Sequence, residues 1–319
     1  MKKKEEEEPQ ESWEDLLESD DDDAWDADKE PTSPIVEEVV EDIDELRYRG
    51  DELRTWWLDR KASPEYAAMR DQRASLPANN ARESFVSLAG DATRDCHRDR
   101  VVVCGETGSG KTTQLPHYLL DAALCAGGER AARIRIVVTQ PRRVAATSVA
   151  TRVAQECGED EIGGLVGYHI RHERRCSSRT KILFCTAGVL LRCLRGATST
   201  HSDGDDGADF VRKATHIVLD EIHERAADSD LLLAALRRTV AAQHRREKAR
   251  KLSLVLMSAT LDAQLFQKYL DAALRGSEKA QTTPLVTISG RAHPVQNYFL
   301  EDVVAATGYV AAACGGNDR

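Results

Sequence analysis

The sequence lacks any apolar run approaching the ~18 residues that a membrane-spanning helix requires. Its start, Met1 followed by three lysines and four glutamates, also lacks the apolar stretch of a secretory signal. The eight cysteines form no Cys-x-x-Cys pair, and several lie within apolar runs, which indicates reduced, buried thiols rather than a disulfide framework. These absences argue against a membrane protein or a secreted one, and we expect a cytoplasmic or nuclear location.

Charge is unevenly distributed along the 319 residues. Residues 1–45 hold 21 of the 54 acidic side chains and 4 of the 44 basic ones, which leaves 33 acidic and 40 basic side chains in the remainder. The overall net charge of −10 therefore hides a mildly basic body that is able to face a polyanion. Residues 1–34 contain too few apolar side chains to offset the entropy of ordering, so this acidic tail is expected to be disordered. A solvated spacer is favoured over a short motif that binds a protein partner.

The domain plan follows from a change in the sequence pattern. Residues 1–60 are assigned to the tail, with an amphipathic helix over 36–57 whose apolar pattern is interrupted at Gly50. Residues 61–300 form the folded domain, in which near-continuous apolar strands alternate with helices. Such strands are buried on both faces, so the fold class is α/β with a doubly wound, mainly parallel sheet. Strands are predicted at 100–104, 133–139, 181–185, 215–220, 252–257 and 285–289, helices near 111–126, 142–156, 187–195, 225–243 and 261–274, and a polar loop at 196–209.

A phosphate-binding sequence follows the first predicted strand. Residues 105–112 fit the pattern G-x-x-x-x-G-K-[ST], whose glycines let backbone N–H groups converge on phosphate oxygens at a helix N-terminus. A fortuitous glycine-rich turn is the alternative, but the motif stands between a strand and a helix, as the chemistry demands. The predicted ATP-binding residues here are Gly105, Glu106, Thr107, Gly108, Ser109, Gly110, Lys111, Thr112 and Thr113.

A carboxylate pair ends another apolar strand. Asp220 and Glu221 would lie at the carboxyl edge of the sheet, where open α/β folds bind ligands. Asp220, together with the Thr112 hydroxyl, is the predicted holder of Mg²⁺, and Lys111 would reach the phosphates. Glu221 is the candidate to orient the attacking water and accept its proton. The alternative is a pair of carboxylates that merely favours a helix N-terminus.

The string Asp220-Glu-Ile-His223, taken with the phosphate-binding sequence, resembles the DEAH/RHA family of ATP-dependent RNA helicases, most closely the branch of RNA helicase A. Four further segments agree in order: Thr139–Ala146, Val166–Arg171, Thr186–Arg192 and Ser258–Thr260. The resemblance covers residues 66 to 302 and implies a RecA-like P-loop NTPase lobe that uses ATP and Mg²⁺ and binds single-stranded RNA, with DNA not excluded.

The resemblance also implies roles for single positions. Arg142, Arg143, Thr186 and Arg171 would contact the RNA. Arg152 falls where the family stacks an arginine on the adenine. Three others, His223, Ser258 and Thr260, would couple the nucleotide state to movement of the lobes, and His223 is also placed among the catalytic residues.

The family pattern includes a second lobe that supplies arginine fingers, and no such segment is found in these 319 residues. Residues 301–319 are interpreted as the start of a link to that lobe. Because an arginine finger is worth ~10³–10⁵ in rate, we expect this chain alone to hydrolyse ATP slowly or not at all. Two alternatives stay open: a non-catalytic nucleotide- and RNA-binding module from a truncated paralogue, and another P-loop machine such as a DNA translocase. The spacing of His169, His172 and Cys176 is a weak zinc signal, since no fourth ligand lies nearby.

Overall fold

The computed structural model describes residues 43–90, 99–196, 206–245, 252–259, 263–272, 282–290 and 296–309. The predicted disorder of residues 1–34 and the predicted role of Thr260 lie outside these ranges, as does the start of the helix predicted over 36–57.

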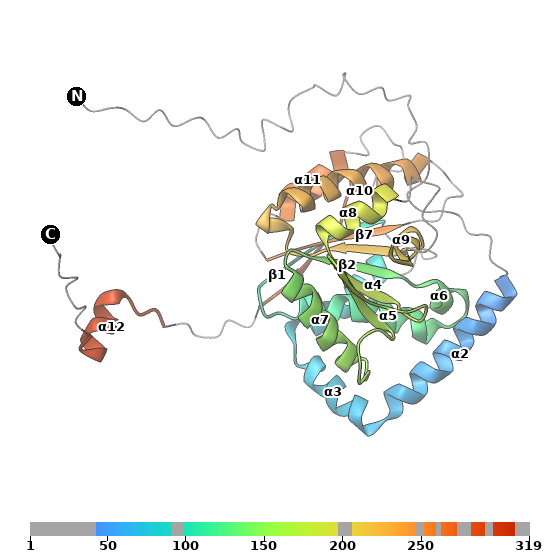
Figure 1. Cartoon of the computed structure of the whole chain (residues 1–319), viewed down its shortest axis with the longest axis horizontal. Coiled ribbons are helices and arrows are strands. Elements are labelled where there is room, and N and C mark those ends of the chain that lie inside the picture. The colour runs from blue at the N-terminus through green and yellow to red at the C-terminus, as the bar shows by residue number, and fades with distance from the viewer. Residues whose placement is uncertain are drawn as a thin grey trace, which may run out of the picture.

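One eight-stranded sheet forms the centre of the molecule (Figure 1). Its strand order is β4-β3-β5-β2-β6-β7-β1-β8, and every neighbouring pair is parallel except β3 with β4. The predicted mainly parallel sheet is thereby confirmed. The strands are β1 (Arg100–Gly105), β2 (Ile136–Gln140), β3 (Val166–Ile170), β4 (Glu173–Arg175), β5 (Ile182–Thr186), β6 (His216–Leu219), β7 (Ser253–Ser258) and β8 (Leu285–Ile288).

Helices cover both faces of this sheet (Figure 1). One face carries α2 (Ile43–Ala62), α3 (Pro64–Ala74), α4 (Arg82–Ala89), α5 (Lys111–Ala126), α6 (Gly128–Arg133) and α7 (Arg143–Glu156). The other face carries α8 (Ala187–Gly196), α9 (Asp206–Arg212), α10 (Ala227–Arg245) and α11 (Ala263–Ala272). Short 3₁₀ helices η2 (Pro77–Ala81) and η3 (Ile222–Glu224) and the exposed helix α12 (Leu300–Thr307) complete the elements.

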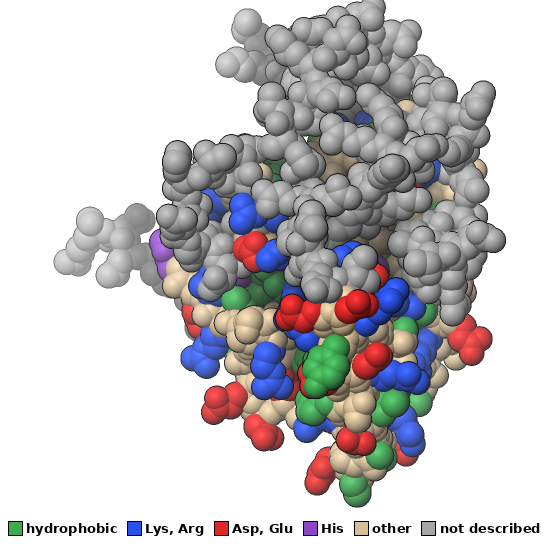
Figure 2. All heavy atoms as spheres, turned by 90° about the vertical axis from the view of Figure 1, so that its right-hand side faces the viewer, with side chains coloured by type: hydrophobic (Ala, Val, Ile, Leu, Met, Phe, Trp, Pro, Cys, Tyr) green, Lys and Arg blue, Asp and Glu red, His purple; other side chains and the backbone are tan. Residues whose placement is uncertain are grey.

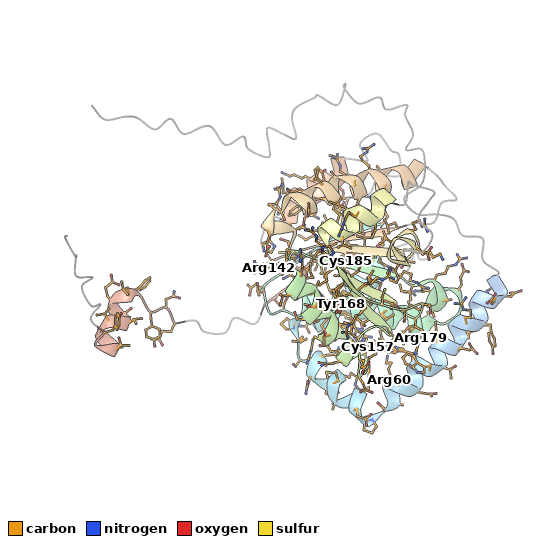
Figure 3. The ribbon with its side chains drawn as sticks, in the orientation of Figure 1. Arg60, Arg142, Cys157, Tyr168, Arg179 and Cys185 are labelled. Carbon is orange, nitrogen blue, oxygen red and sulfur yellow. The ribbon has the colours of Figure 1, made fainter. Side chains whose placement is uncertain are left out.

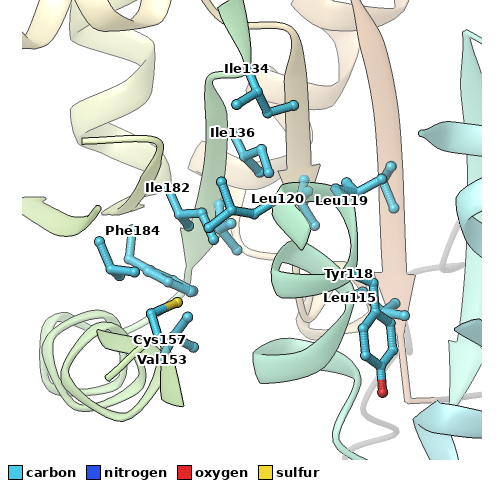
Figure 4. Packing of buried hydrophobic residues seen from close by; sticks show 14 of the residues in the cluster. Leu115, Tyr118, Leu119, Leu120, Ile134, Ile136, Val153, Cys157, Ile182 and Phe184 are labelled. Atoms are coloured by element: carbon cyan, nitrogen blue, oxygen red, sulfur yellow. The ribbon is translucent and has the colours of Figure 1, made fainter. Parts of the chain in front are cut away.

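The strands are apolar throughout because each of them feeds two cores. Val101 and Val103 of β1 pack into the cluster on the side of α5 and α7, whereas Val102 and Cys104 pack into the cluster on the side of α8 and α10. Figure 4 shows part of the first cluster, with Leu120 of α5 on the side of Ile136 and Ile182 of the sheet. This two-sided burial is the physical reason for the continuous apolar runs.

Predicted and observed elements agree in kind and differ at their ends. Every predicted strand and helix of the domain is present, but β2 begins at Ile136 rather than at residue 133, because residues 128–133 form α6. The predicted loop at 196–209 is corrected, since α9 begins at Asp206. Unpredicted elements are α3, α4, α6, α9, α12, β4, η2 and η3, whereas β3 lies in the segment Val166–Arg171 that carries part of the resemblance.

Helix α2 covers residues 43–57 of the predicted N-terminal helix and continues to Ala62. The helix runs through Gly50, where a Cβ atom would lie 1.7 Å from the carbonyl oxygen of Gly128, so glycine allows the backbones of α2 and α6 to approach closely. Further along α2, Trp57 is fully buried and its indole N–H donates to Asp121 Oδ1 at 2.8 Å. The division predicted at residue 61 falls inside this helix.

The face seen in Figure 2, turned toward α2 and α6, carries interspersed acidic and basic side chains. Within the described ranges no helix is both long and apolar enough to cross a bilayer. The described cysteines are thiols rather than disulfides, and burial raises the pKa of Cys157 and of Cys185, both labelled in Figure 3.

Candidate nucleotide-binding site

The phosphate-binding sequence forms the loop between β1 and the N-terminus of α5. Gly108 and Gly110 adopt φ values of +81° and +88°, which side chains with a Cβ rarely adopt. The N–H of Ala78 donates to the carbonyl oxygen of Ser109 at 3.0 Å, so the segment upstream of the loop braces it. Ser109 Oγ is buried and, within the part of the chain that the structure describes, has no hydrogen-bond partner.

Other residues of the loop differ in exposure. Glu106 and Thr107 are exposed on its outer side, whereas Gly105 is buried at the end of β1. Thr113 lies one residue into the helix beyond Thr112, and its hydroxyl donates to the carbonyl oxygen of Gly110 at 3.3 Å. The loop therefore has a rigid backbone and an open outer surface.

The two predicted motifs meet at the carboxyl edge of the sheet. Thr112 Oγ1 donates to Asp220 Oδ2 at 2.6 Å, and Lys111 Nζ lies 3.5 Å from Glu221 Oε1. The strands that present them, β1 and β6, are separated by β7 in the sheet. A parallel sheet therefore brings together side chains that lie more than 100 residues apart in sequence, as the sequence predicts.

Asp220 is held in one orientation by three hydrogen bonds. Its Oδ2 accepts from Thr112 Oγ1 and from Gln140 Nε2 at 2.7 Å, and its Oδ1 accepts from the N–H of Glu221 at 2.9 Å. Burial raises the pKa of the Asp220 carboxyl, with the hydrogen bonds from Thr112 and Gln140 and the Lys111 charge opposing the rise. A carboxylate and a hydroxyl in contact are hard oxygen donors of the kind Mg²⁺ takes beside phosphate oxygens, so the donor set fits that ion.

The backbone after Asp220 is strained. Glu221 and Arg225 have φ values of +53° and +52°, in the left-handed region that residues with side chains rarely occupy. His223 Nδ1 lies 3.3 Å from Glu221 Oε2, and the N–H of Ala259 lies 3.3 Å from the same nitrogen. His223 thus connects Glu221 to the end of β7, where Ser258 is fully buried.

A cleft of about 480 Å³ lies at the same edge of the sheet. Three helices begin at it: α7 at Arg143, α8 after Thr186, and α10 beside Asp228. The N-terminus of a helix carries partial positive charge and free N–H groups, so three such ends favour an anion. Three predicted RNA-contacting residues are among its lining, which consists of Pro141, Arg143, Arg171, Thr186, Ala187, Gly188, Val189, Arg192, Ala226, Asp228 and Ser229.

Two predicted arginines lie outside this lining. Arg142, at the end of the loop after β2 (Figure 3), is exposed and its Nη2 lies 3.4 Å from Glu224 Oε1. Arg152, in the third turn of α7, has a side chain that is 48% exposed and lies 2.9 Å from Glu156.

The residues that were not predicted include Gln140, which contacts Asp220, and Arg192, which lines the cleft. Gln140 stands in the segment Thr139–Ala146 that carries part of the resemblance, and Arg192 ends the segment Thr186–Arg192. The signal for Gln140 is its place at the end of β2, the strand paired with β6, which ends one residue before Asp220. Arg192 lies on α8, six residues after Thr186, and both residues line the cleft.

Comparison with known proteins gives one consistent family. The sequence model described as DEAD/DEAH box helicase matches residues 89–267. The ATP-dependent RNA helicase DHX29 of Mus musculus is 40% identical over 309 residues, covering 95% of this chain and 19% of that protein. The putative ATP-dependent RNA helicase DHX57 of Mus musculus is 42% identical over 251 residues, covering 79% of this chain and 16% of that protein.

A plant protein with a similar sequence is also named as an RNA helicase. The chloroplastic DExH-box ATP-dependent RNA helicase DExH4 of Arabidopsis thaliana is 36% identical over 258 residues, covering 80% of this chain and 16% of that protein. The chain thus spans about a fifth or less of the length of the curated relatives that it matches.

Proposed function

Because the chain belongs to the DEAD/DEAH box helicase family, we propose that it is the ATP-binding lobe of an ATP-dependent RNA helicase. It binds Mg-ATP at the loop before α5 and the backbone of single-stranded RNA at the cleft. The observation that carries the proposal is the 2.6 Å contact between Thr112 Oγ1 and Asp220 Oδ2, beside the Lys111–Glu221 pair. Hydroxyl, carboxylate, ammonium and general base then stand together at a helix N-terminus, the set that phosphoryl transfer needs.

The roles follow from the chemistry of each side chain. The N–H groups of Gly108–Lys111 and the Lys111 ammonium hold the phosphates. Asp220 and Thr112 hold Mg²⁺, which when bound neutralises charge on the phosphate oxygens. Glu221 orients a water molecule and accepts its proton.

RNA contacts in this proposal are made by charge and helix ends rather than by base reading. Arg143, Arg171 and Arg192 line the cleft with the Thr186 hydroxyl. Arg142, exposed beside the cleft, adds a further positive charge. Contacts of this kind hold a phosphate backbone without selecting a sequence.

Gln140 joins the two binding regions. Its amide donates to Asp220, and the next residues of the chain, Pro141 to Arg143, lead directly into the cleft. A shift of this segment when RNA binds would therefore move the hydrogen bond that orients Asp220. His223 and Ser258 would pass the nucleotide state to β7, and Thr260 is proposed for the same role from the family pattern alone.

Hydrolysis by this chain alone is proposed to be slow. Stabilisation of the transferring phosphoryl group by arginine would then come from a second lobe, which strand separation also requires.

Calorimetric titration with Mg-ATP tests the nucleotide site. We expect binding by the wild-type chain and a loss of ~10–100-fold in affinity for Lys111→Ala, since a charge-assisted hydrogen bond is worth ~1.5–3 kcal/mol. Arg70→Ala, on the exposed face of α3, is the control. An unchanged affinity for Lys111→Ala would overturn the assignment.

Fluorescence anisotropy with a single-stranded RNA and a DNA of the same sequence tests the cleft. We expect RNA binding that weakens with salt and falls in Arg143→Ala, with Arg70→Ala again as the control. Preferential DNA binding would favour a DNA translocase, and turnover strongly stimulated by RNA would contradict the requirement for a second lobe.

A further inference from the structure

Arg152 stands at the exposed end of a row of buried polar side chains. Its Nε donates to Glu156 Oε1 at 2.9 Å, one helical turn further along α7. The two side chains differ sharply in exposure, with 48% for Arg152 and 2% for Glu156. A buried carboxylate therefore holds the root of an arginine whose end is open to solvent.

The carboxylate of Glu156 is itself fixed. Its Oε2 accepts from Gln114 Nε2 at 2.8 Å and lies 3.5 Å from Arg73 Nε, while Arg73 Nε donates to Gln114 Oε1 at 2.8 Å. All three side chains are buried. Both carboxylate oxygens of Glu156 accept hydrogen bonds, and Gln114 and Arg73 are also hydrogen-bonded to each other. Glu156 therefore cannot rotate without breaking buried hydrogen bonds.

Gln114 ties this cluster to the phosphate-binding loop. It lies three residues after Lys111 on α5, and its Nε2 also contacts Thr113 Oγ1 at 2.8 Å. Side-chain contacts through Gln114 and Glu156 therefore connect Arg152 to the helix that begins at the phosphate-binding loop. On its other side, Arg152 Nη2 lies 3.9 Å from Met69 Sδ of α3.

We propose that Glu156 is a positioning residue that fixes the Arg152 guanidinium for stacking on the base of the bound nucleotide, with Arg73 and Gln114 holding Glu156. The inference rests on the proposed function, takes the contact between Arg152 and the base from the family pattern, and adds a residue that supports that contact from behind. A guanidinium held at one edge keeps its flat face free to stack on an aromatic base. Fixing it beforehand avoids the loss of side-chain entropy on binding, which is where the gain in affinity arises.

The arrangement predicts that Glu156 matters only for ligands that carry a base. Magnesium tripolyphosphate fills the phosphate loop without reaching Arg152, so it separates the two contributions. In calorimetric titrations of the 319-residue chain, we expect Glu156→Gln to weaken Mg-ATP by about fivefold to tenfold, the size of one cation–π contact. Its affinity for magnesium tripolyphosphate is expected to stay within about twofold of wild type.

Two further variants show whether Glu156 acts through Arg152. In an Arg152→Ala background, Glu156→Gln is expected to cause no additional loss of ATP affinity, because the contact it supports has gone. Glu129→Gln is the matched control: it releases Arg133 from another i,i+4 ion pair, of 2.7 Å, on α6, and is expected to leave both affinities unchanged.

Each possible outcome either supports or contradicts the positioning role of Glu156. Equal losses for ATP and tripolyphosphate, or a loss that persists in the Arg152→Ala background, would overturn the positioning role. If circular dichroism shows that Glu156→Gln does not fold, Glu156→Asp takes its place, since it keeps the buried charge for Arg73 and withdraws the carboxylate from Arg152. A wild-type chain that binds tripolyphosphate as tightly as ATP refutes the inference and leaves the phosphate site standing. Failure to bind either ligand refutes the proposed function itself.

Discussion

Replacing Trp57 by phenylalanine tests whether α2 is a structural part of the domain. Trp57 is fully buried, and its indole N–H donates to the carboxylate of Asp121 at 2.8 Å. Its ring packs edge-on against Tyr66, with centroids 5.6 Å apart and planes at 79°. Phenylalanine keeps an aromatic ring for that contact and removes the hydrogen bond and part of the buried volume.

The expected cost follows from these contacts. A hydrogen bond to a charged group is worth ~1.5–3 kcal/mol. Asp121 keeps its other partners, Lys61 at 2.8 Å and Arg82, so the lower end of that range applies. We expect Trp57→Phe to lower the free energy of unfolding by about 2 kcal/mol, and Trp57→Ala by ~3–5 kcal/mol because of the cavity it leaves.

Urea unfolding followed by circular dichroism measures this cost. With an m-value of about 3 kcal/mol/M, 2 kcal/mol lowers the midpoint by about 0.7 M. Trp56, the half-buried neighbour in the same helix, supplies the control, and Trp56→Phe is expected to cost less than about 1 kcal/mol. A Trp57→Phe midpoint equal to that of wild type, or a loss no larger than that of Trp56→Phe, would refute the reasoning.

Three other predictions follow from the structure. Gly50→Ala places a Cβ 1.7 Å from the Gly128 carbonyl oxygen and is expected to cost ~1–3 kcal/mol in urea unfolding, whereas Glu52→Ala on the exposed side of α2 changes stability by less than about 0.5 kcal/mol. Burial alone would raise the pKa of Asp121, but hydrogen bonds from Lys61 and Trp57 hold it below its ordinary value. Its contribution to stability is therefore present above the unfolded-state pKa of about 4 and is lost as the pH falls through the lower folded value, so Asp121→Asn should flatten the decline of unfolding free energy at acid pH; an equally steep decline would contradict this. Arg192→Ala is expected to lower the salt dependence of RNA binding by about one unit of slope in anisotropy titrations, and a change confined to one RNA sequence would count against a backbone contact.

The fold was predictable where two-sided burial and motif chemistry coincide. The runs ending at Cys104 and Leu219 are apolar because each strand feeds both cores, and the residues after them carry the site. In a parallel sheet the carboxyl ends of all strands lie at one edge. The convergence of Lys111 with Asp220 and Glu221 therefore followed from the topology.

Contacts between different helices and strands could not be predicted from the sequence pattern. Gly50 has the appearance of a helix breaker in sequence, yet it allows the close approach of α2 to α6. The short helix α6 has no clear hydrophobic period, so it was not predicted, and its last residue, Arg133, was assigned to the following strand. Nothing local marks Gln140 or Glu156, because each matters through a partner from another element. The strain at Glu221 is likewise set by its surroundings rather than by its residue type.

The family model matches the chain from residue 89, but the buried core of the domain includes residues that precede this point. Trp57, Tyr66 and Arg73 precede it and complete the outward side of α5, the helix that starts at the phosphate loop. A chain cut at the family boundary would expose Asp121, which has 8% of its side chain accessible, along with the apolar surface beneath α2 and α3. The unit that must be expressed as a whole is therefore longer than the residues 89–267 that the family model matches.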